Sequence, residues 1–360
     1  MGIADLTPLL KECVPNCFVE TPAHNLNNRR MAFDGYNWIF TVLGISVKEA
    51  SKGIDVFDTI NPELVFKNVI RFFLGINLKL LNHKITPVWI WDSPDYVTPQ
   101  KLETRDKRRE ARKKIADKKE NIKEALSNMS VLERPTELVN EFKKLQSTTF
   151  YFPSQKITEL KDLCRRLGIP SITAEGEGEY LAACLAVERI VACVYSGDTD
   201  TIAMGVPFVT KNINKQGGEL YIGGIFTPSI LKTLDLDHQQ FRELCYLLGC
   251  DFNKRVKGVG KKKALELMKK YKCIEKVLEH LDSIQNPDGT KKYDISTINH
   301  EKCKELLTPR PSGFIDKTEL LDITPQEYDE DLDKYNLRDL FETVLSRTRN
   351  FKPAENVPKN

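Results

Sequence analysis

The chain has 360 residues, of which 41% are hydrophobic and 29% are charged. This composition is that of a globular protein with one large core or two modest ones, and it argues against disorder over most of the chain. The 54 basic and 51 acidic residues leave a net charge of only +3, so total charge identifies no partner. The sequence has no apolar run of the roughly 20 residues that span a bilayer, and it lacks a secretion signal. We therefore expect an intracellular protein that contacts no membrane.

The cysteines give a second indication of the compartment. There are nine, an odd number, and they are irregularly spaced. Several lie inside apolar stretches, for example Cys184, Cys193 and Cys245. This pattern predicts reduced thiols in the core of an intracellular protein rather than disulfide bridges.

Apolar runs alternate with helical patterns in the first part of the chain. RRMAFD (29–34) and TPVWIWD (86–92) are short apolar runs that end in aspartate, and a helical pattern separates them. Further along, a helix is predicted at 157–168, a strand at 169–173, a helix at 177–187 and a strand at 189–196. Strands that alternate with helices indicate an α/β fold with a mainly parallel central sheet flanked by helices.

The segment 101–150 departs from this alternation, since much of it is charged and it is too long for an ordinary crossover. It predicts an inserted helical arch, with a long exposed helix over 101–126 and a second helix within 135–146. Beyond residue 215 strands become scarce, and helices are predicted at 239–249, 261–271 and 336–347. Residues 283–298 are expected to form a loop.

These patterns divide the chain into six parts. The expected parts are an N-terminal α/β region (1–100), the arch (101–150), an internal α/β region (151–235), a helix-hairpin-helix region (236–282), a C-terminal helical region that packs on the core (283–348) and a disordered tail (349–360).

Acidic residues stand where predicted strands end and where one helix begins. They are Asp34, Asp92, Asp198 and Asp200 after strands, and Glu177 and Glu179 at the helix start. In an open α/β sheet these ends meet at one crevice, where the acids would repel each other unless divalent cations neutralised them. Oxygen ligands favour Mg²⁺ or Mn²⁺, and two such ions about 4 Å apart can hydrolyse a phosphodiester. Any single acid is more simply explained as a cap or solvated residue, so the repetition carries the hypothesis.

Basic residues gather in two places. The first set recurs at helical spacing and would share one helix face: Lys101, Arg105, Arg108, Arg109 and Arg112. That face is suited to gripping phosphates, although intermixed acids are equally typical of a solvated helix. The second set surrounds a tight turn before a helix, where backbone amides can bind a phosphate without reading a base: Lys257, Gly258, Gly260, Lys261 and Lys262.

An aromatic cluster follows Asp34. Tyr36 and Phe40 would share a helix face, and core packing is the ordinary explanation for such residues. Because they lie one to two helical turns from a candidate metal ligand, base stacking is the alternative.

In chain order, MGI, MAFD, VWIWDSP, EGEGE, SGDTDTIAMG, LGCDF and GVGKKKALELM resemble the motif series of the flap endonuclease family of 5′ nucleases, the XPG/Rad2 type, from residue 1 to about 350. The resemblance implies two Mg²⁺ ions, which Mn²⁺ can replace, held by the six acids and by Asp251. It implies that Lys101 and Arg108 contact the scissile phosphate as catalytic residues. It also implies that Phe40 stacks on a substrate base and that Gly2 lies near the site.

The sequence departs from the family pattern at two motifs. Glu175 and Gly176 stand where a Pro-Ser pair is usual, and Lys261 replaces the usual proline of the hairpin turn. The tail also lacks the usual sliding-clamp box, so clamp binding is not expected. The chain resembles a divergent member of the family, and a viral origin is one interpretation of this divergence.

The resemblance implies a monomer that acts on branched or nicked duplex DNA with a 5′ flap or 5′ end, in the nucleus or, for a viral member, at a cytoplasmic replication site. Within the family the alternatives are a 5′-3′ exonuclease or a junction resolvase. Outside it they are a catalytically silent junction-binding protein and a small-molecule phosphatase.

Overall fold

The structure is a computed structural model, and it describes residues 2–53, 55, 57–96, 99–310 and 337–349. For residues 99–108 and 349 it describes the backbone alone.

One mixed sheet forms the centre of the described chain, with strand order β1-β7-β6-β5-β2-β3-β4. The five strands from β6 to β4 are parallel, while β7 and β1 extend the β6 edge in antiparallel fashion. The strands are β1 (Phe18–Pro22), β2 (Arg30–Asp34), β3 (Thr86–Trp91), β4 (Ser171–Thr173), β5 (Cys193–Tyr195), β6 (Phe208–Gln216) and β7 (Glu219–Phe226). The expected α/β fold with a mainly parallel central sheet is confirmed.

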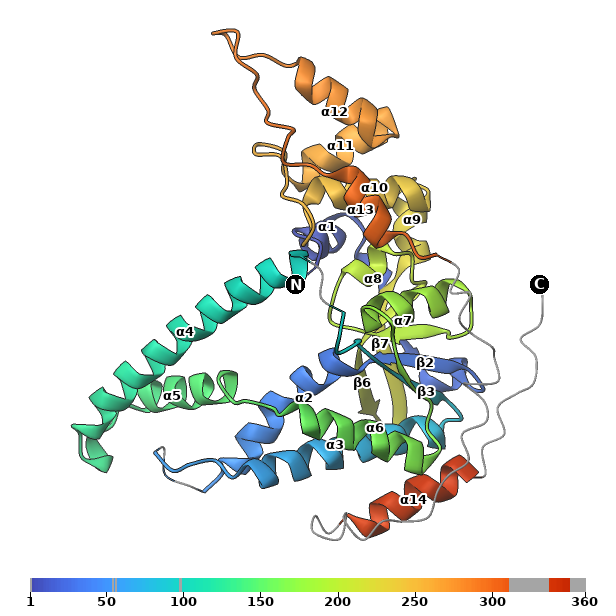
Figure 1. Ribbon diagram of the computed structural model, residues 1–360. Coiled ribbons are helices and arrows are strands. Elements are labelled where there is room, and N and C mark those ends of the chain that lie inside the picture. The colour runs from blue at the N-terminus through green and yellow to red at the C-terminus, as the bar shows by residue number, and fades with distance from the viewer. Residues whose placement is uncertain (1, 54, 56, 97–98, 311–336, 350–360) are drawn as a thin grey trace.

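Helices cover both faces of this sheet (Figure 1). One face packs against α2 (Gly35–Ala50), α3 (Pro62–Asn82), α6 (Ser154–Leu167) and α14 (Arg338–Arg349). The other face packs against α7 (Gly178–Val187) and α8 (Asp200–Ala203). The core on this side continues away from the sheet into α1 (Leu6–Cys13), α9 (Thr227–Leu234), α10 (His238–Leu248), α11 (Lys261–Tyr271), α12 (Ile274–Ser283) and α13 (His300–Leu307). Short 3₁₀ segments are η1 (Pro15–Cys17), η2 (Ala23–Leu26) and η3 (Val131–Glu133).

Strand β3 shows why the sequence folds this way. All six of its residues are buried, as expected for a parallel strand covered on both faces. Val88 and Ile90 face the layer that contains α7, whereas Trp89 faces α2 and α3. There Trp89 stacks on Phe33 at a ring-centroid distance of 4.6 Å. The apolar run TPVWIW therefore carries side chains for both cores.

The hairpin of β6 and β7 was not expected, and the prediction that strands are scarce beyond residue 215 is wrong for 219–226. Most of the outer half of β6 is exposed and polar, so it lacks the apolar run of a buried strand. Backbone pairing with β7 holds it instead. Gly217 and Gly218 form the turn at φ +57° and +92°, a conformation that glycine adopts without strain.

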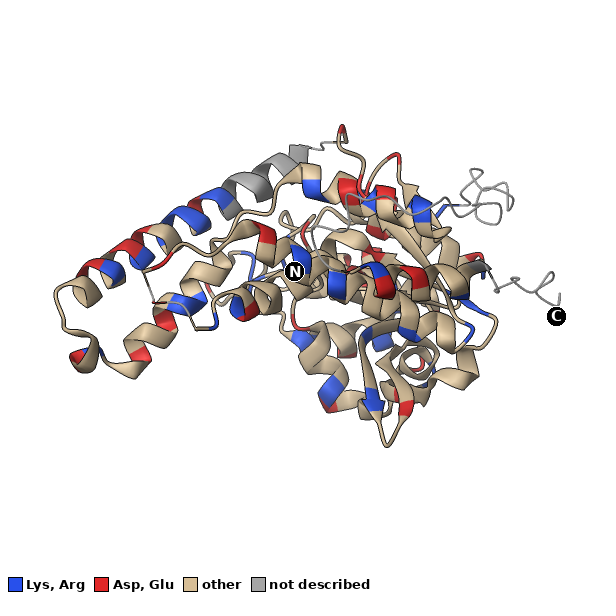
Figure 2. Cartoon of the chain, turned by 90° about the horizontal axis from the view of Figure 1, so that it is seen from below, with Lys and Arg blue, Asp and Glu red and all other residues tan. Residues whose placement is uncertain are grey.

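The arch consists of α4 (Pro99–Ser127) and α5 (Thr136–Thr148), which project from the body together (Figure 1). The expected long helix and second helix are both confirmed. Their contact is a small core of Ile122, Leu126 and Phe142. Basic and acidic residues are interspersed along the described part of α4, as Figure 2 shows.

The three helices predicted for the last third of the chain are confirmed as α10, α11 and α14. Phe341, Val344 and Leu345 of α14 are buried in the same core as α3. Apart from Ser283, which ends α12, the predicted loop 283–298 has no helix, and it contains one isolated bridge between Gln285 and Lys291. The predicted disordered tail begins at Arg349, which ends α14, and its remaining residues lie outside the described ones.

Two bulk predictions can be compared with the structure. All nine cysteines are free, and six of them are buried, which confirms reduced thiols. Within the described ranges, no helix has the length and apolar character to cross a membrane.

A buried hydrogen bond between α3 and β3 gives a test of the fold. Asn77 Oδ1 accepts from Trp89 Nε1 at 3.0 Å, and both residues are fully buried. We expect Asn77→Leu to lower the free energy of unfolding by about 2 kcal/mol, because the indole N–H stays buried without an acceptor. Urea denaturation measures the change. The exposed Asn25→Leu is the control, and equal stability of the two variants would contradict the assignment.

Candidate active site

The order in which the chain adds strands to the sheet reverses at β2. From β2 the chain proceeds to β3 and β4 on one side, and later to β5 and β6 on the other side. At such a switch point the loops after neighbouring strands leave in opposite directions, which opens a crevice at their carboxyl ends. Asp34 is the last residue of β2, Asp92 directly follows β3, and Asp198 lies in the loop after β5. The topology therefore brings three predicted acids to one crevice.

Asp34 joins the end of β2 to the start of α2. It is the N-cap of α2, its Oδ1 accepts from Asn37 N at 3.0 Å, and it is only 9% exposed. Asn37 in turn accepts a hydrogen bond from Gly197 N at 2.9 Å. The first turn of α2 thus fixes both Asp34 and the loop that carries Asp198.

The EGEGE segment places two glutamates at the start of α7. Glu177 is the N-cap and Glu179 lies in the first turn. Between them, Gly178 donates its N–H to Asp92 Oδ1 at 2.9 Å. A Cβ on Gly178 would lie 3.1 Å from the Trp91 carbonyl carbon, so this glycine allows α7 to approach the end of β3 closely. The glycine that makes this contact stands between the two glutamates, and this position gives them their i, i+2 spacing.

Asp198 and Asp200 are linked to each other and to Glu179. Asp198 Oδ1 accepts from Asp200 N at 3.2 Å. Ser196 Oγ accepts from Asp198 N at 3.0 Å and donates to Glu179 at 3.4 Å. Asp200 is 6% exposed, and its Oδ1 is buried without a hydrogen-bond partner in the described structure. A buried carboxylate oxygen in this state is suited to a cation.

The charges of the acids act on one another. Burial and the negative charges of Asp92 and Asp198 together raise the pKa of Asp34 to about 7, although the hydrogen bond from the Asn37 N–H acts in the opposite direction. Burial also raises the pKa of Glu179, as do the charges of Asp198, Asp34, Asp200 and Glu177.

Asp251 is coupled to the same group from the segment between α10 and α11. Burial raises the pKa of Asp200, and the charges of Asp198 and Asp251 add to that effect. Each of the seven predicted acids therefore acts on at least one other across the crevice.

The residues present fit divalent cations. All seven donors are carboxylates, the ligands that hard cations prefer, and the buried Asp200 oxygen has no hydrogen-bond partner among the described residues. No three of the seven have ligand atoms within 4.8 Å of one another; among the described residues that spacing occurs in Glu243, Cys273 and Glu275, and in Glu275, His300 and Glu301. The seven acids are thus spread more widely than the ligands of a single ion. Such a spread is compatible with two ions about 4 Å apart.

The N-terminal segment closes one side of the crevice. Ile3 N donates to Thr199 Oγ1 at 2.8 Å, and Ala4 N donates to the Gly249 carbonyl at 2.8 Å. Gly2 has φ +111°, and a Cβ there would lie 1.9 Å from Asp198 Oδ1. The structure therefore places Gly2 directly beside an acid of the site.

Two lysines beside the acids were not predicted. Lys161 of α6 donates to Thr173 Oγ1 at 3.1 Å and lies 5.7 Å from the Trp91 ring centroid, next to Asp92. Burial lowers its pKa, and the charge of Asp92 opposes that shift. Neither motif nor spacing marks this lysine in the sequence, because α6 reads as an ordinary amphipathic helix.

Lys211 is the second of these lysines. It stands at a register shift between Thr210 and Asn212 in β6, where a bulge re-aims a side chain. Burial lowers its pKa, while the charge of Asp198 opposes the shift. A bulge in a polar strand gives no sequence signal.

The predicted basic residues fall into three groups. Lys101, Arg105 and Arg108 lie on α4 by backbone, but their side chains are outside the described structure. Arg109 and Arg112 are exposed on α4.

The third group lies at the turn before α11. Gly258 has φ +83°, Gly260 is the N-cap of α11, and Lys257 is exposed. Lys261 and Lys262, by contrast, form ion pairs with Glu12 of α1 at 2.9 and 2.6 Å.

The aromatic residues after Asp34 separate into core and surface. Trp38 is buried, and Tyr36 packs edge-on against Trp91. Phe40 is 62% exposed, which is uncommon for a large apolar side chain. Packing thus explains Tyr36 and Trp38 and leaves Phe40 available for contact with a ligand.

Comparison with known proteins identifies the family of this chain. Residues 1–115 match the model of the XPG N-terminal domain, and residues 168–251 match that of the XPG I-region. The flap endonuclease 1 of Encephalitozoon cuniculi is 30% identical over 284 residues, covering 78% of this chain and 76% of that protein. The chain belongs to the XPG/Rad2-type flap endonuclease family of structure-specific 5′ nucleases.

Other members of this nuclease family differ in length or are more distant in sequence. The flap endonuclease 1 of Cryptosporidium parvum is 29% identical over 304 residues, which cover 80% of this chain but 58% of that protein. The catalytic core of Rad2 in complex with DNA substrate shares the fold, with a TM-score of 0.56, 22% identity and coverage of 96% of each chain.

The raised pKa of Asp34 gives a test by pH. Its value of about 7 lies well above the unfolded value of roughly 4, so the stability it contributes is present below about pH 4 and is lost as pH rises through 7. Cations that bind in the crevice and neutralise its charge would restore the lost stability. We expect Mg²⁺ to raise the melting temperature more at pH 8 than at pH 5.5, measured by calorimetry. A Mg²⁺ effect of equal size at both pH values would contradict this electrostatic coupling.

The contact between Gly2 and Asp198 gives a second test. Gly2→Ala should reduce DNA cleavage at least tenfold, because the added methyl group displaces Asp198 or the N-terminal segment. Gly217→Ala is the matched control, since Gly217 also has positive φ but faces open space. Unchanged cleavage by Gly2→Ala would place the N-terminal segment elsewhere.

Proposed function

We propose that this nuclease uses Mg²⁺, or Mn²⁺ in its place, to hydrolyse one phosphodiester at a 5′ flap or 5′ end of branched or nicked duplex DNA. The observation that carries the proposal is the gathering of seven carboxylates at the sheet crevice, with a buried Asp200 oxygen that has no hydrogen-bond partner in the described structure. Acids in this number and with raised pKa values are unfavourable for the fold alone. Divalent cations bound between these acids would explain their presence, and the same cations could also bind the oxygens of a phosphodiester.

The chain's own residues would divide the work as follows. Asp34 and Asp200 form the buried part of the ligand set, Glu179 is half-buried, and Asp251 adds a carboxylate from the segment before α11. When bound, the ions supply an activated water and stabilise the leaving oxygen. Asn37 holds the loops of Asp34 and Asp198 together, so the ligand positions are preorganised.

Contacts to DNA would come from three surfaces. The backbone around Gly258 and the start of α11 can bind phosphates without reading bases. The exposed side chains of α4, including Arg109 and Arg112, can follow a single strand, and Phe40 can stack on a base. The Rad2 core with the same fold was solved with DNA substrate, which supports a DNA partner here. Specificity would then be for DNA shape rather than sequence.

The alternatives are less well supported. The relatives' names favour flap cleavage over exonuclease or resolvase activity, and a panel of flap, nicked, gapped and four-way substrates separates these. A silent junction-binding protein would have no need of seven mutually repelling acids. A cleavage assay with and without Mg²⁺ decides that alternative.

Replacement of Asp198 gives the direct test of the metal site. Asp198→Ala removes a ligand and the acceptor of the Asp200 N–H, so cleavage should fall at least a thousandfold while junction binding persists. Single-turnover cleavage and fluorescence anisotropy measure the two properties. The surface variant Asp282→Ala controls for loss of a negative charge. Full activity of Asp198→Ala in Mg²⁺ would refute the assignment.

The ion pairs of Glu12 generate a prediction for DNA affinity. Lys261 and Lys262 must exchange Glu12 for phosphate if the turn binds DNA. Glu12→Gln should therefore tighten junction binding about threefold at low salt, an effect that fades as salt rises. Glu20→Gln on β1 makes the same charge change away from the turn and should leave affinity unchanged. Weaker binding by Glu12→Gln would show instead that the ion pairs shape the turn.

A further inference from the structure

Two cysteine side chains meet at the turn that carries Asp251. Cys250 immediately precedes Asp251, and Cys303 lies on α13, 53 residues further along the chain. Their Sγ atoms are 3.6 Å apart, so the two sulfurs are in direct contact. Neither cysteine belongs to the candidate metal site or to the surfaces that would bind DNA. The proposed function leaves this contact unexplained.

Both thiols donate to one acceptor in the turn. Asn253 Oδ1 accepts from Cys250 Sγ at 3.4 Å and also from Cys303 Sγ. Asn253 is buried, and its Nδ2 donates to the Tyr246 carbonyl at 3.0 Å. Two backbone hydrogen bonds between Cys250 and Asn253 close the turn, with N···O distances of 3.1 and 3.3 Å. The two S–H groups are therefore among the contacts that hold Asp251 in its place.

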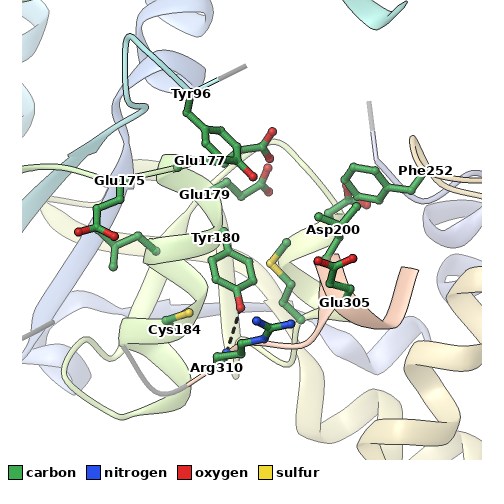
Figure 3. A pocket seen from close by; sticks show the side chains of 15 residues that line it. Tyr96, Glu175, Glu177, Glu179, Tyr180, Cys184, Asp200, Phe252, Glu305 and Arg310 are labelled. Carbon is green, nitrogen blue, oxygen red and sulfur yellow. Dashed lines mark hydrogen bonds between the residues drawn. The ribbon is translucent and has the colours of Figure 1, made fainter. Parts of the chain in front are cut away.

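The turn and α13 both border the metal-site acids (Figure 3). Phe252, the residue after Asp251, lines the same cavity as Asp200. Glu305 of α13 lines this cavity as well. The negative charge of Asp251 also acts on Asp200. A movement of the turn relative to α13 therefore reaches the acids directly.

The two sulfurs differ in their access to solvent. Cys303 is fully buried on α13, whereas Cys250 is partly exposed. A hydroperoxide in solution can therefore reach Cys250 and oxidise it to a sulfenic acid. Sulfenic acids condense with a neighbouring thiol to give a disulfide, and the Cys303 thiol is already in contact.

We propose that Cys250 and Cys303 form a reversible disulfide when a hydroperoxide oxidises the protein, and that this bond displaces Asp251 from the metal site. The consequence for Asp251 rests on the proposed nuclease function, whereas the formation of the bond does not. All nine cysteines are free in the structure, so the disulfide is a response to oxidant rather than a permanent link.

The oxidation is balanced with the hydroperoxide as the only oxidant. The Cys250 sulfur forms a bond to one peroxide oxygen, the O–O bond breaks, and the other oxygen leaves as water or an alcohol with the thiol proton. The Cys303 sulfur then forms a bond to the Cys250 sulfur, the S–O bond breaks, and the oxygen leaves as water with the second thiol proton. The two sulfurs together lose two electrons, which the hydroperoxide gains.

Formation of the bond moves the turn for two reasons. The sulfurs must approach from 3.6 Å to about 2.0 Å, so one side of the pair shifts by roughly 1.5 Å. Because Cys303 is fixed in the core, that shift falls on the turn. The disulfide also has no S–H group, so the buried Asn253 Oδ1 loses both donors. A carboxylate displaced by this amount no longer fits the narrow range of metal–ligand distances.

Thiol labelling and mass spectrometry test the bond itself. After treatment with hydrogen peroxide and unfolding, two of the nine cysteines should no longer react with N-ethylmaleimide, and dithiothreitol should restore them. Peptide mass spectrometry without reduction should identify Cys250 linked to Cys303. Cys273→Ser, which removes another partly exposed thiol, should form the same link. Oxidised protein in which Cys250 and Cys303 are not linked to each other would overturn the proposal.

DNA cleavage tests the consequence for Asp251. The linked protein should cleave a 5′-flap substrate in Mg²⁺ about tenfold more slowly than the reduced protein, and dithiothreitol should restore the rate. Cys303→Ser keeps a hydroxyl donor for Asn253 but cannot form the bond, so peroxide should leave its cleavage rate unchanged. Equal rates for the linked and reduced protein, or equal peroxide sensitivity of Cys303→Ser, would overturn the displacement of Asp251.

A metal-binding measurement separates this outcome from a failure of the nuclease function. Mn²⁺ titration followed by electron paramagnetic resonance should show weaker binding to the linked protein than to the reduced protein. Peroxide-treated and untreated Cys303→Ser should bind Mn²⁺ equally. The same Mn²⁺ affinity in the linked and reduced protein would overturn the displacement of Asp251. Absence of cleavage by the reduced protein would contradict the nuclease function, and the titration would still decide the proposal.

Discussion

The mutual repulsion of seven carboxylates at one crevice is the constraint on which the other features of this nuclease depend. Burial and neighbouring charge raise the pKa values of Asp34, Glu179 and Asp200, so the cation-free site opposes folding at neutral pH. The fold tolerates this because packed elements hold Asp34, Glu179 and Asp200 in place. The switch point at β2 supplies the positions, and the helix starts of α2, α7 and α8 supply the orientation.

Three residues near the crevice allow the acids to lie close together. Gly178 lets α7 approach Asp92, and Gly2 fits against Asp198 where no side chain has room. Asn37 connects the loops after β2 and β5 through two hydrogen bonds. These contacts hold Asp34, Asp92 and the segment that carries Asp198 in place before any ion binds, and metal-assisted hydrolysis depends on such preorganisation.

Periodicity and strand-end acids were sufficient to predict the parallel strands, the arch helices and six of the acids that meet at the crevice. These features have strong local signals, because a buried parallel strand is an apolar run and its end is a defined point. Asp251 came only from family resemblance, since it follows a helix rather than a strand. The β6–β7 hairpin was missed because backbone pairing and a Gly-Gly turn hold its polar half, and Lys161 and Lys211 were missed because tertiary packing alone brings them to the acids.

The central claim is that the seven carboxylates are a two-ion site. Anomalous diffraction from crystals soaked in Mn²⁺ measures this most directly, because the manganese positions appear without reference to activity. The account predicts two peaks between the loops that carry Asp34, Glu179, Asp198 and Asp200, both lost in the Asp200→Asn variant. Peaks confined to other groups, such as Glu275 and His300, with none in the crevice, would contradict it.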